Sequence, residues 1–206
     1  MNLIKELIMI INEKLLTDYG AELITCRKDD SLFSINDIPD NYFQIESGLI
    51  KVTSEKYGNN QFIHDFANAG DPVGEAFLFS ENRYTVNAVA VIPSNIYVLP
   101  NKEFRELTND HSKALHKFLK HICEREIYNL MLIKTIAFSE PRDKILTVID
   151  HFKKMNERSN YKLYEVPFTR QQLASLTGLR VETVIRTMKI MESENLVEII
   201  DGKVFI

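Results

Sequence analysis

The sequence has only two cysteines, Cys26 and Cys123, and they lie far apart in a chain of 206 residues. Their separation gives neither the close spacing of a metal site nor the four thiolates that an iron–sulfur cluster usually requires. A few unpaired thiols are typical of proteins from a reducing compartment. We therefore expect a cytoplasmic protein without an iron–sulfur cluster.

Long hydrophobic runs and an excess of positive charge are also missing. No apolar stretch approaches the roughly 20 residues needed to cross a membrane. Charged residues within the first 16 positions argue against a signal peptide. The net charge of −4 gives no general attraction to nucleic acid or to an anionic membrane. Any contact with DNA must therefore come from a local basic patch.

The motifs of common catalytic sites are absent as well. The sequence contains no Gly-rich phosphate loop, no Ser-His-Asp set and no metal-ligand cluster, so we expect no enzyme. What it does contain is 45% hydrophobic and 26% charged residues, the composition of a globular protein.

The most informative stretch is FTRQQLASLTGLRVETVIRTMKIM, residues 168–191. Thr169 can cap a first helix, and Gln172 completes a capping box three residues later. Gly178 can end that helix in the left-handed conformation, and a second helix begins near Val181. The apolar face of the second helix consists of Val184, Met188 and Met191. Two short helices around a glycine turn predict a helix-turn-helix.

The surroundings of this motif favour DNA binding over an ordinary helical hairpin with a solvated face. Four basic residues and one acid lie between Thr169 and Met191, in a chain of negative total charge. Downstream, alternating apolar residues flank Asp201-Gly202, a strong signal for a type I′ hairpin. A helix-turn-helix closed by a two-stranded wing is a DNA-binding module.

The region between Glu22 and Leu99 has a different character, because short apolar runs alternate there with turn clusters. Short strands at this spacing predict an antiparallel barrel or roll. A helix over residues 3–16 is expected to precede it. The expected strands are AELITC (21–26), SLFSI (31–35), NYFQIES (41–47), LIKVTSE (49–55), QFIHDFA (61–67), YTVNAVAV (84–91) and NIYVL (95–99).

From Asn101 to Ala137 the pattern is helical again, with an apolar stripe that is too long merely to cover a small roll. The stripe consists of Leu115, Leu119, Ile122, Glu126, Leu130, Ile133 and Ala137. We predict a dimerisation helix that meets its symmetry mate through residues 115–137. Three roles are open for Glu126: a polar residue that sets the register, a ligand contact, or a solvent-facing side chain beside Arg125.

Ser139, Glu140 and Pro141 are expected to form a hinge, because proline ends the long helix but suits the first turn of the next, over residues 142–154. An exposed loop is expected at 156–162 and a short strand at 164–166. The predicted fold is therefore α+β. It comprises an N-terminal antiparallel β-roll (1–109), a dimerisation helix (110–138) and a C-terminal winged helix-turn-helix (139–206).

This order of elements resembles that of the Crp/Fnr family of bacterial transcription regulators. Three motifs carry the resemblance: YFQIESGLIKV (42–52), AGDPVGEAFLF (69–79) and TRQQLASLTGLRVETVIRTMK (169–189). The resemblance implies a cyclic-nucleotide-binding-like jelly roll that senses an effector. It also implies a homodimer that binds double-stranded DNA and contacts RNA polymerase in the cytoplasm.

The resemblance also assigns base contacts. Glu182 matches a glutamate that accepts a hydrogen bond from cytosine N4, and Arg186 matches an arginine that reads guanine O6 and N7. Val181 resembles the Fnr branch, which implies a TTGA-type half-site read as an inverted repeat. Ile185 departs from the serine common in that branch, so it either contacts a thymine methyl group or belongs to the core.

Five further residues are candidates for DNA contact: Thr169, Arg170, Gln171, Arg180 and Lys189. All except Arg180 are expected at phosphates, which position a protein on DNA without specifying sequence. For Arg170 and Lys189, membership of a solvated face is an equal alternative.

The sensor half departs from the family's cyclic-nucleotide pattern. In binders, a Gly-Glu pair, here Gly74-Glu75, holds the ribose hydroxyl and precedes an Arg-Ser/Thr-Ala run whose arginine neutralises the phosphate. If Thr85 aligns with the Ser/Thr, Tyr84 takes the arginine position and Arg83 faces the other side of a strand. A register shift could restore Arg83, but without one we expect no cyclic nucleotide. These five residues are the candidate effector site.

Haem is not supported either, because nothing in the spacing of the available histidines favours an axial ligand; they are His64, His111, His116 and His121. The long helix has Asn129 and Leu130 where the catabolite activator has a Thr-Ser pair that contacts adenine. The trigger could be another small anionic or apolar ligand, or none. A regulatory module that acts through protein contacts rather than DNA is the alternative function.

Overall fold

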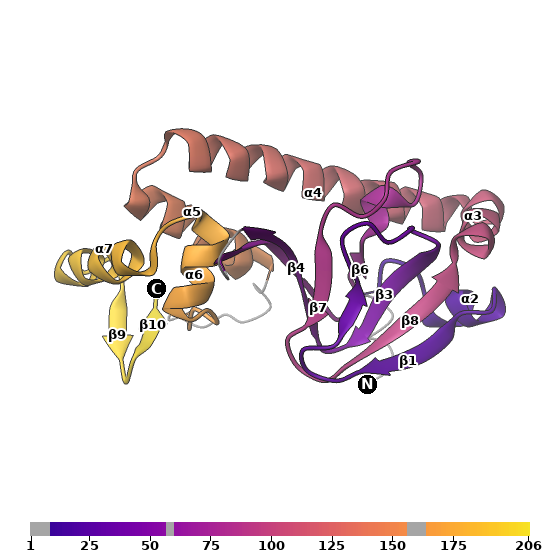
Figure 1. Ribbon diagram of the computed structural model, residues 1–206, viewed down its shortest axis with the longest axis horizontal. Helices are drawn as coiled ribbons and strands as arrows, with labels where there is room; N and C mark the ends of the chain where they lie inside the picture. Colours follow the sequence, from indigo (N-terminus) through magenta and orange to yellow (C-terminus); the bar gives the residue numbers. More distant parts are fainter. Residues whose placement is uncertain (1–8, 57–59, 156–163) are drawn as a thin grey trace. The chain divides into compact units, whose positions relative to one another are not determined.

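The computed structural model describes residues 9–56, 60–155 and 164–206 (Figure 1). The chain divides into two compact units, one up to Glu126 and one from Ile127. The long helix α4 (Ser112–Phe138) runs through this boundary. No helix in the described part of the chain is long and apolar enough to span a membrane.

The first unit contains two four-stranded antiparallel sheets, with strand orders β1-β8-β3-β6 and β2-β7-β4-β5 (Figure 1). All seven predicted strands are present within a few residues of their expected bounds. They are β1 (Glu22–Cys26), β2 (Ser31–Phe33), β3 (Asn41–Ser47), β4 (Leu49–Lys56), β5 (Asn60–Asn68), β7 (Asn87–Ala90) and β8 (Ser94–Pro100). The two-residue strand β6 (Pro72–Val73) was not predicted. Tyr84 to Val86, expected as strand, precede β7 in irregular backbone.

Alternating side chains from these strands fill the interior of the roll. Ile45, Ile50 and Ile96 are completely buried between the sheets. A second cluster forms where the roll meets the helices, and there Tyr42 stacks on Phe104 at 4.2 Å between ring centroids. Each such side chain stabilises the fold by about 1.5–3 kcal/mol relative to exposure. The roll therefore has a core of its own.

The predicted N-terminal helix is shorter than expected. Residues 1–8 lie outside the described part of the chain, and helix α2 (Glu13–Asp18) begins only after Asn12, whose side chain accepts a hydrogen bond from the backbone of Lys14. Ile11 instead exchanges two backbone hydrogen bonds with the buried Gln44 side chain, of 2.9 and 2.8 Å. The helix prediction was wrong for residues 9–12, because this tertiary pairing and the Asn12 cap outweigh the helical spacing.

The region predicted to be helical from 101 to 137 forms two helices, α3 (Asn101–Asp110) and α4, with a break at His111. One face of α4 is buried and contains Ala114, Phe118, His121, Tyr128, Leu132 and Thr135. Another face exposes large apolar side chains, with Ile127, Leu130 and Ile133 at 67%, 59% and 64% of full exposure. Glu126 lies on this exposed face.

The second unit packs three helices against one another: α5 (Pro141–Met155), α6 (Arg170–Thr177) and α7 (Val181–Ser193). Strands β9 (Glu198–Ile200) and β10 (Lys203–Phe205) form the predicted hairpin. Asp201 and Gly202 have φ values of 48° and 80°, as a type I′ turn requires. The strand expected at 164–166 is reduced to a bridge between Glu165 and Phe205. The loop expected at 156–162 lies outside the described residues.

Candidate functional site

The turn between α6 and α7 is built as the sequence predicts. The Thr169 hydroxyl accepts a hydrogen bond from the backbone of Gln172 at 3.1 Å, and the Gln172 side chain accepts one from the backbone of Thr169 at 2.9 Å. Gly178 ends α6 with a φ of 68°, in the left-handed region that disfavours other residues. The capping box and the glycine together fix where α6 ends and α7 begins.

Helix α7 separates its side chains into a buried and an exposed face. Its buried side chains are Val184, Thr187, Met188 and Met191. Glu182 and Arg186 are exposed and lie one helical turn apart, so they share a face. Ile185 is 42% exposed beside them and is therefore not part of the core. These three side chains are free to meet a groove.

The remaining candidate DNA contacts lie at the starts of both helices and along α7. Thr169, Gln171, Arg180 and Lys189 are exposed. Arg170 and Val181 are half-buried. In the wing, Lys203 forms an ion pair of 2.7 Å with Glu165.

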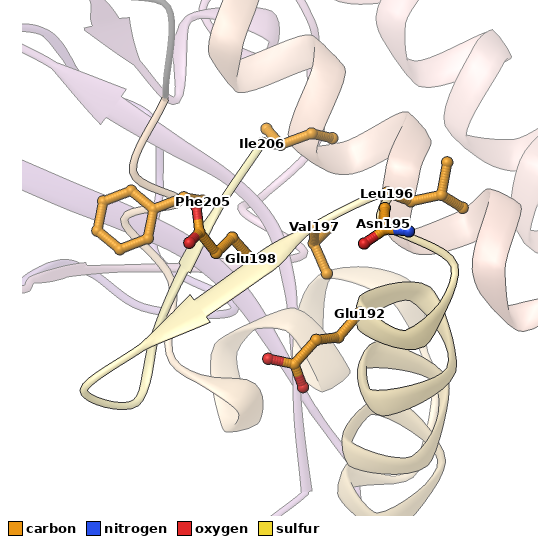
Figure 2. Close-up of a pocket in the computed structure, with 7 residues that line it drawn as sticks. All are labelled: Glu192, Asn195, Leu196, Val197, Glu198, Phe205 and Ile206. Carbon is orange, nitrogen blue, oxygen red and sulfur yellow. The ribbon is translucent and has the colours of Figure 1, made fainter.

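A hollow of about 380 Å³ lies where α7 leads into the wing (Figure 2). It is lined by Glu192, Asn195, Leu196, Val197, Glu198, Phe205 and Ile206. The hollow is poorly suited to bind phosphate, because the carboxylates of Glu192 and Glu198 would repel an anion. It also lies about 15 Å along the helix axis from Glu182, since α7 rises 1.5 Å per residue. The hollow is therefore separate from the face that carries the candidate base contacts.

In the roll, Gly74 and Glu75 begin the 3-10 helix η1 (Glu75–Phe77), as their place in the Gly-Glu motif suggests. Gly74 has a φ of 75°, and an added Cβ would lie 2.7 Å from the Phe33 ring and 3.0 Å from the Tyr84 ring. Only glycine fits there without displacing both rings.

The side chains of the adjacent residues Tyr84 and Arg83 lie in different environments. Tyr84 is buried and stacks on Phe33 at 3.8 Å between ring centroids, with Phe77 edge-on at 5.1 Å. Burial and the nearby carboxylate of Glu75 raise the pKa of Tyr84, so its side chain is an uncharged phenol. Arg83 is exposed and donates a hydrogen bond to the carbonyl oxygen of Asn36 at 2.8 Å. Its charge therefore lies at the surface of the roll, and the register shift that would bring it inside does not occur.

Arg83 and Tyr84 instead border a second hollow of about 490 Å³ at the edge of the roll. Its other lining residues are Leu32, Phe33, Asn36, Asp37, Ile38, Asp40, Asn41 and Phe43. Gly74, Glu75 and Thr85 do not line it. The structure therefore does not bring the predicted effector residues together: Arg83 and Tyr84 border this edge, Gly74 and Glu75 lie at η1, and Thr85 is exposed.

Glu75 meets a residue that the sequence did not single out for it. The imidazole Nε2 of His121, on α4, lies 3.5 Å from the Glu75 carboxylate, and both side chains are buried. Burial raises the pKa of Glu75, but His121 and the guanidinium of Arg125 outweigh that effect and leave this pKa below its usual range. Glu75 is therefore a charged group inside the protein.

A second contact between α4 and a buried carboxylate lies one helical turn further along the helix. Arg125 contacts the carboxylate of Asp65, from β5. Burial raises the pKa of Asp65 to about 6, against the lowering effect of Arg125. Sequence reasoning missed this pair, although the four-residue spacing of His121 and Arg125 places them on the helix face that contains Phe118 and Tyr128, and a polar pair on such a face is a detectable signal.

The other candidate haem ligands lie apart from this cluster. His64 contacts the Ser54 hydroxyl at 3.0 Å, while His111 and His116 are exposed. Within residues 9–56, 60–155 and 164–206, no group of three or more His, Cys, Asp or Glu side chains could hold a metal ion.

Comparison with known proteins bears on both units. Residues 23–111 match the family model of the cyclic nucleotide-binding domain, and residues 147–206 match that of the Crp-like helix-turn-helix domain. The chain belongs to the Crp/Fnr family. It is accordingly a DNA-binding transcription regulator with the fold that the sequence predicts.

Individual Crp/Fnr relatives are distant but span most of the chain. The cAMP-activated global transcriptional regulator CRP of Pasteurella multocida is 24% identical over 158 residues, which cover 76% of this chain and 75% of the relative. The cAMP-activated regulator Vfr of Pseudomonas aeruginosa is 23% identical, with 76% of each chain covered. The c-di-GMP responsive regulator CLP of Xanthomonas campestris has the same fold, with a TM-score of 0.78, 18% identity and coverage of 93% and 95%.

Proposed function

We propose that the chain acts as a homodimer that binds an inverted repeat of TTGA-type half-sites. The observation that carries this proposal is the exposed face of α7, where Glu182 and Arg186 lie one turn apart opposite the buried Val184 and Met188. Glutamate can accept a hydrogen bond from cytosine N4, and arginine can donate two to guanine. Two such helices related by a two-fold axis would enter major grooves about 34 Å apart.

The exposed apolar face of α4 supports the homodimer. Leu119, Leu130 and Ile133 are large side chains that a single subunit leaves in water. Side chains at spacings of three and four residues form a seam when two helices associate. Residues 115–137 are the proposed dimer interface, between a sensing roll at 1–109 and a DNA-binding region at 139–206. RNA polymerase is the expected partner, in the cytoplasm.

The effector is proposed to differ from that of the cAMP-activated relatives. A cyclic phosphate needs a buried cation, and the position that would supply it holds the uncharged Tyr84, stacked on Phe33. Arg83 is exposed and bonded to Asn36. Addition of cyclic AMP is therefore expected to leave the affinity for DNA unchanged.

Fluorescence anisotropy with a labelled duplex that contains an inverted TTGA-type repeat tests the proposal. Arg186→Ala should weaken binding to this duplex by about 1–3 kcal/mol per half-site and leave binding to a scrambled duplex unchanged, because a bidentate contact to guanine carries discrimination. Lys189→Ala is the matched control on the same helix. It should weaken binding to both duplexes alike, as expected for a phosphate contact.

If wild type and Arg186→Ala bind both duplexes equally, the chain does not read this repeat through α7. A role through protein contacts would then be the better account of its function.

A further inference from the structure

The roll contacts α4 through two side-chain pairs, the buried His121 with Glu75 and the half-buried Arg125 with the buried Asp65. The carboxylates come from different parts of the roll, since Glu75 begins η1 and Asp65 lies in β5. The imidazole of His121 and the guanidinium of Arg125 come from successive turns of one face of α4. Both carboxylates therefore contact the helix that continues into the second unit.

The His121 imidazole is buried against the Glu75 carboxylate, as a small bound ligand would be. The imidazole is enclosed rather than solvated, and its Nε2 contacts the Glu75 carboxylate at 3.5 Å but has no hydrogen-bond partner among the described residues. The groups that act on this site are few: Glu75 faces His121, Asp71 and Arg125 lie near enough to affect its neighbours electrostatically, and Asp65 is held by Arg125.

We propose that His121 is an internal ligand of the roll: its imidazole takes the position on Glu75 that an effector would otherwise occupy, and it keeps the regulator competent to bind DNA with no small molecule present. This inference rests on the proposed function, in which the roll controls α4. The occupant comes from the same helix that transmits the signal, so the coupling is intramolecular.

A rescue experiment with imidazole tests this role on the full chain. Wild type should bind the repeat-containing duplex without any added small molecule. His121→Ala should lose about tenfold or more in affinity, within the usual range of coupling between two sites. Free imidazole should restore part of that loss, because it can fill the vacated space and meet Glu75. Lys120→Ala removes a solvent-exposed pair with Glu124 on the same helix and should neither lose affinity nor respond to imidazole.

A second pair of variants separates hydrogen bonding from folding. His121→Gln keeps a donor that can reach Glu75 and should bind DNA more tightly than His121→Leu, which fills similar space without a donor. Equal affinities for these two variants would overturn the proposal. So would a His121→Ala protein that imidazole stabilises against heat without any gain in affinity for DNA, because His121 would then be structural only.

Hydrogen exchange of the α4 amides provides a readout that does not depend on DNA. Protection should fall in His121→Leu and His121→Ala, and imidazole should restore it in His121→Ala. If wild type binds no duplex but this pattern holds, His121 still acts as the occupant of the Glu75 position, whereas the proposed DNA function and the claim that His121 maintains DNA binding both fail. If protection does not change, the internal ligand is refuted whatever the DNA result.

Discussion

At the scale of single residues, the roll contains two buried carboxylates whose pKa values shift in opposite directions. Asp65 and Glu75 are both buried carboxylates, yet the pKa of Asp65 is raised to about 6 and that of Glu75 is lowered. The difference arises because desolvation dominates at Asp65, whereas His121 and Arg125 together overcome it at Glu75. The contributions of these two acids to the free energy of unfolding therefore change with pH in opposite directions.

The raised pKa of Asp65 predicts a specific pH dependence of stability. Between about pH 4 and pH 6 the native roll keeps a proton on Asp65 that the unfolded chain, with an ordinary pKa, has released. Through this site, the free energy of unfolding therefore falls as the pH rises through that window. Chemical denaturation in that window should show this slope, and Asp65→Asn should remove it.

A carboxyl titration by NMR measures the same group directly. The Asp65 resonance, assigned by its absence in Asp65→Asn, should titrate near pH 6. Arg125→Met should move this midpoint upward, because the guanidinium is the main influence that lowers it. A midpoint near 4 in wild type would show that burial does not control this carboxyl group. An unchanged midpoint in Arg125→Met would show that the guanidinium does not act on it.

Residue-scale features were the hardest to foresee from the sequence. Capping by Thr169 and the turn at Gly178 could be predicted, because they depend on residues adjacent in the chain. The pairing of His121 with Glu75 depends on residues 46 positions apart brought together by the roll, and a histidine on an apolar helix face does not reveal its partner.

At the scale of elements, the alternation of apolar and polar residues located most strands, because one face of each sheet is buried. Strand β6 was missed because two residues are too few to show a period. The first helix was placed too early, because Ile10 and Ile11 fit a helical pattern while Gln44 holds the backbone of Ile11 in a bend outside the helix. Tertiary contacts override local spacing in such short segments.

The turn between α6 and α7 predicts the effect of a small substitution. Gly178 has a φ of 68°, and a β-carbon costs about 1–2 kcal/mol in this conformation. Gly178→Ala should lower the free energy of unfolding by about that amount in thermal denaturation. Gly178→Asn should lose less, since asparagine adopts the left-handed region more readily. Equal stability of all three proteins would show that α6 can end in another way.

The exposed face of α4 predicts opposite effects of two substitutions on dimerisation. In the proposed symmetric seam, the two copies of Glu126 would place like charges close together, so Glu126→Leu should tighten the dimer. Leu130→Glu should weaken it by about tenfold or more, because a buried leucine contributes about 1.5–3 kcal/mol. Sedimentation equilibrium measures both constants. If wild type is monomeric at micromolar concentration, the proposed dimer interface is refuted.

Cys123 offers a direct test of the same seam. It is exposed and follows Leu119 by four residues and precedes Glu126 by three, which is the spacing of a helical interface. Mild oxidation should therefore produce a covalent dimer on a non-reducing gel. Cys123→Ser should abolish this species, whereas Cys26→Ser should not, because Cys26 is buried.

At the scale of the whole molecule, one helix belongs to both compact units. Helix α4 carries His121 and Arg125 in the first unit and Tyr128 in the second, where the Tyr128 ring stacks on His151 at 3.5 Å. The general architecture could be predicted because each unit has its own sequence pattern, whereas the contacts on this shared helix could not.

Tyr84 and Phe33 also limit what one substitution at this site could achieve. An arginine at position 84 would leave Phe33 without its stacking partner, and Glu75 would still be in contact with His121. A redesign of the roll for an anionic ligand would therefore have to replace the aromatic pair and the His121 contact together, and each change made alone should give a less stable protein.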